Sequence, residues 1–237
     1  MEKILHPANS RGTANYGWLK ANYSFSFANF FDPKKVQFGL LRVLNDDYVQ
    51  AGMGFGTHPH QNMEIISIPL KGEIRHKDSM DHTKVITAGE VQVMSAGTGV
   101  EHSEFNSSKE ELNMLQIWIF PEQNGLEPRY DQKDFSELLE NNKLINIVSP
   151  KSDRSENALY INQQAYLHLG DFEAGRKIDY KLKNEAHGVY IFLIEGEAEV
   201  DGNLLKRRDA AGIWDTSTVS LEFKTNSKVL LIEVPMN

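Results

Sequence analysis

Short apolar runs alternate with breaks at Gly, Asn and Asp along the first half of the chain. Between residues 36 and 120 these runs are "VQFGLLRVLNDD", "MEIISIPLKGEIRH", "KVITAGEVQVMSAG" and "LNMLQIWIF". Each run is rich in β-branched and aromatic residues and has the length of a strand. The pattern predicts antiparallel β-structure, arranged as a sandwich or barrel.

A polar stretch then interrupts the pattern. The segment "PRYDQKDFSELLENNKL", Pro128 to Leu144, predicts a linker with one or two helical turns from Asp134 to Asn141. Beyond it the strand pattern returns in "LINIVS", "ALYINQQAYLHLGDF", "GVYIFLIEGEAEV", "AGIWDTSTVSLEF" and "KVLLIEVP". We therefore expect an all-β protein of two tandem domains, residues 1–130 and residues 131–237.

The two halves resemble each other weakly. The segments "EIISIPLKGEIRH" and "GVYIFLIEGEAEV" align on Gly72 and Gly196, and both read as strand, glycine turn and strand. The same offset places Leu182, Asn184 and Gly188 at the positions of His58, His60 and Glu64. The alignment predicts two duplicated barrels, of which only the first keeps polar residues at these three positions.

Composition narrows the class of protein. The 237 residues include 33 Asp and Glu against 25 Lys and Arg, a formal net charge of -8, which argues against a nucleic-acid or anionic membrane surface as the main partner. Cys is absent, so any metal would be held by nitrogen and oxygen. The start "MEKILHPANSRG" has no signal-peptide core and no long apolar run follows, so we expect a cytoplasmic protein.

Two histidine-containing pairs are the main candidates for chemistry. His58 and His60 lie two residues apart in "GFGTHPHQNMEI", and His102 and Glu104 lie two apart in "AGTGVEHSEFN". Residues two apart share a face of a strand, and Glu64 keeps the parity of the first pair if that strand continues. Placed on facing strands of a barrel, the pairs predict a mononuclear metal site with open positions.

Other polar and aromatic residues have simpler explanations. A lone histidine is more often hydrogen-bonded or solvated than a ligand, which is our expectation for His6, His82, His168 and His187. His76 suits a core or surface role better than a role as hydrogen-bond donor to a metal ligand. Gln116, in "MLQIWIF", fits pocket lining and an exposed face equally. The aromatic run "NYSFSFANFFDP" favours core over the wall of a ligand pocket.

The combined motifs resemble a known family. "GMGFGTHPHQNMEIISIPLKG" and "GEVQVMSAGTGVEHSEFN" are similar to the two cupin motifs of the pirin family, and "WLKANYSFSFANFFDP" resembles its N-terminal region. The resemblance implies a bicupin with one metal, in the N-terminal barrel. It implies the ligands His58, His60, His102 and Glu104, with Glu64, the usual cupin carboxylate, as the alternative to Glu104.

The resemblance also implies an activity. Bacterial pirin-like proteins include quercetin 2,3-dioxygenases, which predicts a flavonol and dioxygen as substrates and Glu104 as the catalytic base. Fe(II) is the expected metal, and Ni, Mn, Cu or Zn would suit the same ligands. The alternative is a non-enzymatic, iron-dependent regulator that binds a transcription factor or a metabolic enzyme. We expect a monomer.

Overall fold

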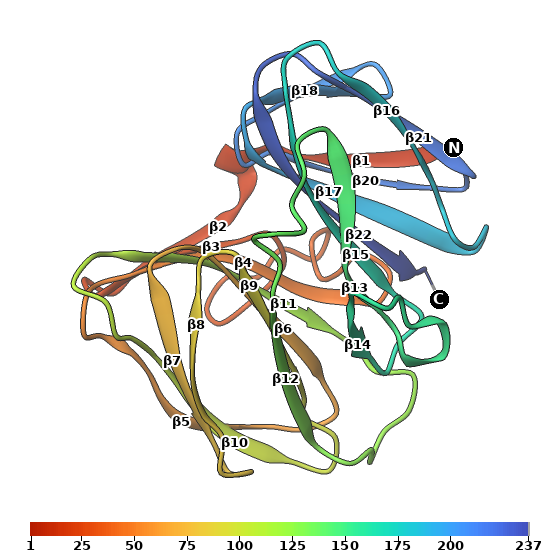
Figure 1. Ribbon diagram of the computed structural model, residues 1–237. Coiled ribbons are helices and arrows are strands. Elements are labelled where there is room, and N and C mark those ends of the chain that lie inside the picture. Colours follow the sequence, from red (N-terminus) through yellow and green to blue (C-terminus); the bar gives the residue numbers. More distant parts are fainter. Residues whose placement is uncertain (237) are drawn as a thin grey trace.

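The structure, a computed structural model, describes residues 1–236 and is built almost entirely of β-strands (Figure 1). The strands form four sheets, two with seven strands and two with four. Each half of the molecule combines one large and one small sheet into a barrel, which confirms the expected all-β bicupin. No helix among these residues is long and apolar enough to cross a membrane.

The first barrel has its large sheet in the order β12-β9-β6-β11-β4-β3-β2 and its small sheet in the order β5-β10-β7-β8. Its strands are β2 (Gly12–Asn15), β3 (Leu19–Tyr23), β4 (Leu41–Val49), β5 (Gly54–His60), β6 (Glu64–Lys71), β7 (Glu73–Asp78), β8 (Thr83–Thr87), β9 (Glu90–Ser95), β10 (Val100–Asn106), β11 (Leu112–Ile119) and β12 (Arg129–Asp134).

The second barrel has the orders β1-β20-β17-β22-β15-β13-β14 and β16-β21-β18-β19. Its strands are β1 (Glu2–His6), β13 (Lys143–Pro150), β14 (Leu159–Ile161), β15 (Tyr166–Phe172), β16 (Lys177–Lys181), β17 (His187–Glu195), β18 (Glu197–Val200), β19 (Asn203–Lys206), β20 (Ala210–Trp214), β21 (Thr218–Phe223) and β22 (Ser227–Pro235). Two short 3₁₀ turns, η1 (Ala8–Ser10) and η2 (Lys151–Asp153), complete the assignment.

The large sheets meet in the middle of the molecule and share one apolar core. That core includes Ile66 and Ile117 from the first barrel with Leu167 and Ile232 from the second. A large sheet is therefore covered on both faces, which favours apolar residues along nearly the whole strand. In β6 every residue from Glu64 to Pro69 is buried, whereas exposed and buried residues alternate along β10 of a small sheet.

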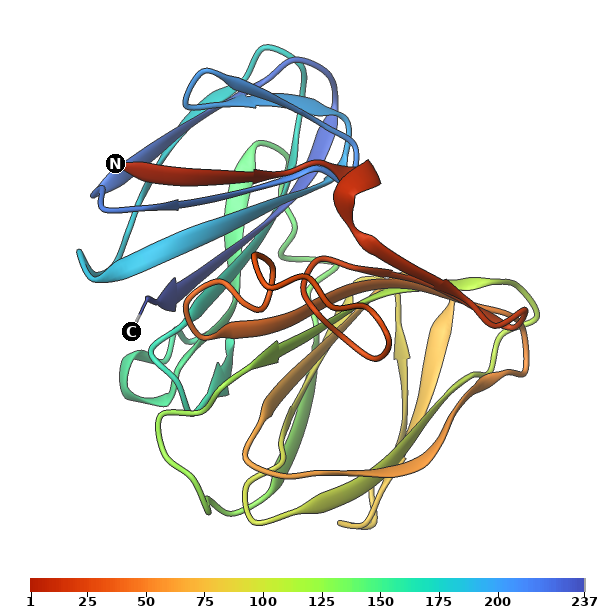
Figure 2. The same ribbon diagram turned by 180° about the vertical axis from the view of Figure 1, so that it is seen from behind.

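The chain does not divide between the barrels at a single point. Strand β1 pairs with β20 of the second barrel, and Figure 2 shows this N-terminal strand lying against the C-terminal half. Strand β12 pairs with β9 of the first barrel, so position 130 falls inside a strand. We propose that the domain division follows β12, with β1 exchanged into the second domain.

The linker expected to carry one or two helical turns between Asp134 and Asn141 contains a single turn and no regular helix. This segment forms a hydrogen-bonded turn, in which the Leu139 N–H donates to the Phe135 carbonyl at 3.0 Å. Only eight residues separate β12 from β13, and this turn occupies most of that span. Instead, fully buried Phe135 anchors the segment in the shared core.

The internal repeat is present, with one correction to its alignment. Gly72 and Gly196 both adopt positive φ, 81° and 91°, between equivalent strands. Ile74 and Ala198 each lie two residues after the turn glycine, and they pair with Asn106 and Phe223 respectively, so Phe223 is equivalent to Asn106. Four residues earlier on each strand, Val219 is therefore equivalent to His102.

The strand that faces Val219 completes the comparison. Val219 pairs with Tyr180, where His102 pairs with His58, so Tyr180 rather than Leu182 occupies the position of His58. By the same count Leu221 stands at the position of Glu104. The equivalent positions of the second barrel are thus filled by an apolar cluster.

Candidate metal centre

Three imidazoles converge in the first barrel, where β5 and β10 pair. His58 lies directly opposite His102 and His60 opposite Val100, so strand pairing brings the two separate motifs together. The Nε2 atoms of His58 and His102 are 3.1 Å apart. One nitrogen from each of His58, His60 and His102 lies within 4.8 Å of the others. This spacing suits three ligands of one ion.

A close backbone approach holds the two strands in this register. A β-carbon on Gly54 would lie 2.2 Å from the Glu104 carbonyl oxygen, so only glycine fits at the start of β5. The register then shifts between His102 and Glu104, where β5 carries an extra residue. Such a bulge re-aims neighbouring side chains, here those at the edge of the candidate centre.

Two of the three histidines, His60 and His102, are held in the neutral form that a metal ligand requires. Burial, together with the nearby His102 and His58, lowers the pKa of His60 to about 4. Burial and the nearby His58 and His76 lower the pKa of His102 to about 3. His58 is oriented by a contact of 2.8 Å between its Nδ1 and the Gly56 carbonyl, which makes Nδ1–H the donor and leaves the Nε2 lone pair free.

Glu104 lies beside the imidazoles and is fixed by two donors. Gln116 Nε2 donates to Glu104 Oε2 at 2.8 Å, and Ser67 Oγ donates to Oε1 at 3.1 Å. Each carboxylate oxygen keeps a second lone pair. Glu104 groups most closely with His102 and His76, since one ligand atom of each lies within 4.8 Å of the others. Gln116 therefore lines the site, which settles its two interpretations.

His76 is closer to the centre than its sequence context suggests. It is fully buried on β7, pairs with Glu104 across the small sheet, and its ring lies 5.4 Å from that of His102. Its Nε2 contacts Asp78 Oδ2 at 3.0 Å, and Asp78 also contacts His82. Burial alone would raise the pKa of Asp78, but these hydrogen bonds hold it below its usual value. The signal that sequence reasoning missed was the spacing of His76 and Asp78, two apart on one strand face.

Glu64, the alternative carboxylate, lies outside this centre. It accepts hydrogen bonds from Ser95 Oγ at 2.7 Å and from Asn162 Nδ2 at 3.1 Å. Strand β5 ends at His60, and Asn62 adopts φ 50° before β6 begins in a different sheet. Glu64 and Ser67 are three apart on β6, so they face opposite sides, and it is Ser67 that reaches Glu104.

A cavity of about 200 Å³ opens beside the histidines. Tyr23, Phe27, Phe55 and Trp118 contribute aromatic walls, and His58 and His60 lie at its edge. The Phe27 and Trp118 rings pack edge to face at 5.3 Å, and Trp118 packs on His60 at 4.9 Å. The aromatic run beginning at Asn22 therefore serves two purposes, because Phe25 joins the shared core while Tyr23 and Phe27 line the cavity.

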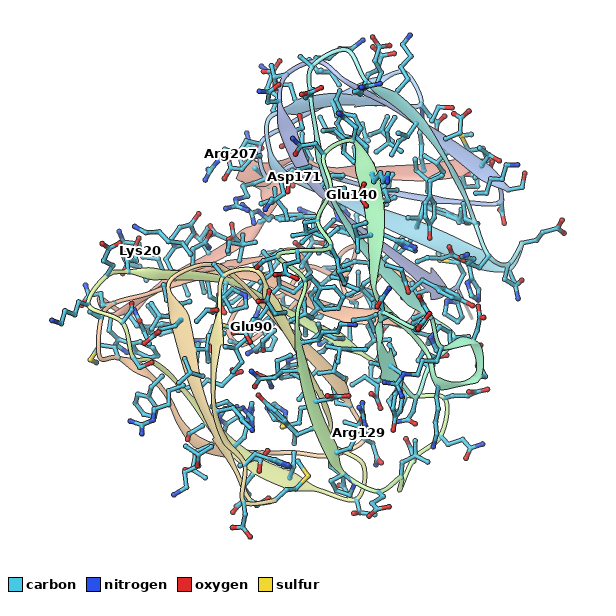
Figure 3. The ribbon with its side chains drawn as sticks, in the orientation of Figure 1. Lys20, Glu90, Arg129, Glu140, Asp171 and Arg207 are labelled. Atoms are coloured by element: carbon cyan, nitrogen blue, oxygen red, sulfur yellow. The ribbon has the colours of Figure 1, made fainter. Side chains whose placement is uncertain are left out.

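A larger cleft lies elsewhere, between the two barrels. It measures about 660 Å³, and none of the four candidate ligands lines it. Figure 3 marks Asp171 and Arg207 on this side of the molecule, both of which line the cleft. Several of its charges are paired, among them Arg207 with Glu195 and Lys228 with Asp171 at 3.4 Å.

Two of the remaining histidines make structural hydrogen bonds, as expected. His6 Nδ1 contacts the Tyr190 hydroxyl at 2.9 Å, and His187 Nδ1 contacts Glu233 Oε1 at 2.8 Å. Both hydrogen bonds lie in the second barrel and contribute to its packing.

The fold and this histidine cluster define a two-domain cupin protein with one candidate metal centre. The Pirin family model matches residues 5–119, and a model described as the quercetinase C-terminal cupin domain matches residues 146–234. The chain belongs to the pirin family.

Curated relatives match this chain along nearly their whole length. A protein of Escherichia coli strain K12 named quercetin 2,3-dioxygenase is 41% identical over 232 residues, which cover 98% of each chain. A pirin-like protein of Caulobacter vibrioides is 37% identical over 227 residues, covering 96% of this chain and 97% of the relative. The solved structure of the E. coli bacterial pirin YhhW in complex with nickel(II) superposes with TM-score 0.92 at 39% identity and covers 99% of both chains.

Proposed function

We propose that this protein is a metal-dependent flavonol 2,3-dioxygenase, which uses dioxygen to cleave the central ring of a quercetin-like substrate. The observation that carries the proposal is the convergence of three imidazoles beside an aromatic cavity, with Glu104 grouped with one of them, His102. The name of the E. coli relative agrees with this activity.

The proposed ligands are His58, His60, His102 and Glu104. The Nε2 atoms of His58 and His102 face each other at 3.1 Å, and burial keeps His102 neutral, so a divalent cation bound between the imidazoles would find unprotonated nitrogen donors there. Nitrogen and oxygen donors suit first-row metals generally. We propose Fe(II), while the E. coli relative is described with nickel(II).

Residues of the chain would then deprotonate the flavonol and hold its ring in place. A divalent metal bound here would act as a Lewis acid and lower the pKa of the flavonol 3-hydroxyl. Glu104 would take the hydroxyl proton as general base. Gln116 and Ser67 hold both of its oxygens in place for that transfer. The aromatic walls suit a planar ring and exclude water from it.

Replacing Gln116 with leucine tests the positioning of Glu104. Loss of a hydrogen-bond partner behind a ligand costs roughly 10- to 100-fold in activity or metal affinity. We expect kcat for quercetin to fall within that range while the fold is retained. Steady-state kinetics beside elemental analysis would check this, and an unchanged kcat would mean that Ser67 alone positions the carboxylate.

Oxygen uptake on quercetin tests the activity itself. The purified protein, loaded anaerobically with Fe(II), should consume one dioxygen for each quercetin lost, and a chelator should stop both. Binding of quercetin without oxygen uptake, for Fe(II) and for Ni(II) alike, would contradict the proposed reaction.

A non-enzymatic regulator is the second candidate function. It would be favoured by a metal centre sealed from solvent, with its oxidation state read through a surface. His58 and His60 are instead partly exposed at the edge of the cavity. This access favours a reaction with a small molecule over a purely structural signal.

A further inference from the structure

Two buried polar residues line the cavity without any role in holding the proposed ligands. Strand β4 pairs with β11, so that Asn45 lies opposite Gln116 and Asp47 opposite Met114. Side chains directly opposite in a sheet share a face, which places Asn45 beside the residue that holds Glu104. Asp47 lies two residues further along the same face, roughly 6.6 Å away at 3.3 Å per residue.

One oxygen atom of each residue has no hydrogen-bond partner among the described residues. Asn45 and Asp47 are only 2% and 3% exposed, and within residues 1–236 their Oδ1 atoms have no hydrogen-bond partner. Leaving a buried polar group unpaired costs about 1–3 kcal/mol. The neighbouring Asp46, on the opposite face of β4, is by contrast engaged by Asn113 at 2.8 Å and Arg208 at 3.4 Å.

The environment of Asp47 favours its neutral carboxyl form, which forms hydrogen bonds rather than ion pairs. Burial, reinforced by Asp46 and Glu104, raises the pKa of Asp47 well above its usual value. A neutral carboxyl group both donates and accepts a hydrogen bond. A hydroxyl group also both donates and accepts a hydrogen bond, so a ligand hydroxyl can pair with the carboxyl group of Asp47.

The size of the cavity limits how much of a ligand meets these residues. At about 200 Å³ it is smaller than the roughly 300–1,000 Å³ typical of ligand pockets. A flavonol would therefore insert one ring between the aromatic walls and leave the rest at the partly exposed edge formed by His58 and His60.

We propose that Asn45 and Asp47 form the polar end of the substrate cavity and bind a hydroxyl group on the aromatic ring that enters it. They thereby select hydroxylated aromatic substrates over unsubstituted ones. This inference rests on the proposed function, because it takes the cavity as the substrate site.

A comparison of two flavonols tests the selection. Quercetin carries ring hydroxyls, whereas 3-hydroxyflavone keeps only the oxygens that a metal would bind. Anaerobic titration of the Fe(II)-loaded protein, followed by tryptophan fluorescence, gives the Kd of each without turnover. We expect quercetin to bind about tenfold more tightly, the equivalent of one hydrogen bond of about 1.4 kcal/mol.

Asp47→Ala should abolish that preference by weakening quercetin alone, and Asp47→Asn should retain part of it. The control is Glu64→Gln, which alters a buried carboxylate outside the cavity and should leave both Kd values unchanged. Because Asp47 lacks a protein partner at Oδ1, Asp47→Ala should not lower the Tm.

The outcomes separate the two proposals. An unchanged preference in Asp47→Ala, or an equal loss of both ligands with a lower Tm, would overturn the role of Asp47 and leave the dioxygenase proposal standing. Failure of the wild-type protein to bind either flavonol would overturn both.

Discussion

Replacing His102 with alanine should strip the metal and abolish quercetin turnover while both barrels stay folded. His102 belongs to both ligand groups of the centre and is almost fully buried, so its loss removes a ligand from each group. Metal affinity should fall by more than the roughly 10- to 100-fold that loss of an outer partner costs. Elemental analysis after dialysis, with circular dichroism for the fold, measures both effects.

A matched control for this variant is His168→Ala. His168 is a buried histidine of the second barrel, where the position equivalent to His58 is Tyr180 and those equivalent to His102 and Glu104 are Val219 and Leu221. It should keep its metal and its activity. If His102→Ala kept full metal occupancy, His102 would not be a metal ligand.

Glu104→Gln should reduce kcat far more than it reduces metal content. The substitution keeps the size of the side chain but removes its basicity, and loss of a general base typically costs about 10²- to 10⁴-fold. Three imidazoles remain to hold the metal. Parallel measurement of kcat and bound metal would distinguish this effect from simple loss of a ligand.

The comparison variant is Glu64→Gln. Glu64 is held by Ser95 and Asn162 on the other face of the large sheet, so its substitution should leave kcat nearly unchanged. The reverse pattern, with Glu64→Gln inactive and Glu104→Gln active, would assign the catalytic carboxylate to Glu64.

Local patterns predicted much of this arrangement. The short apolar runs rich in β-branched and aromatic residues predicted the all-β class. A spacing of two residues predicted that His58 shares a strand face with His60, and His102 with Glu104. The glycine turns at Gly72 and Gly196 marked the repeated hairpins, since both need a positive φ. These features depend only on neighbouring residues, so a single sequence reveals them.

Features that depend on distant parts of the chain were not predictable in the same way. The break at Asn62 moves Glu64 into another sheet, which simple alternation along β5 does not reveal. The exchange of β1 into the second barrel and the approach of His76 to Glu104 are set by strand pairing between remote segments. Asp47 looks like one of two acidic residues in a strand until the pairing of β4 with β11 shows which face it takes.

The most direct measurement is anomalous X-ray diffraction from crystals of the Fe(II)-loaded protein. The account predicts a single metal peak in the first barrel, bonded to His58, His60, His102 and Glu104, with none in the second barrel. A peak bonded to other residues, or no peak at this cluster in fully loaded crystals, would contradict it.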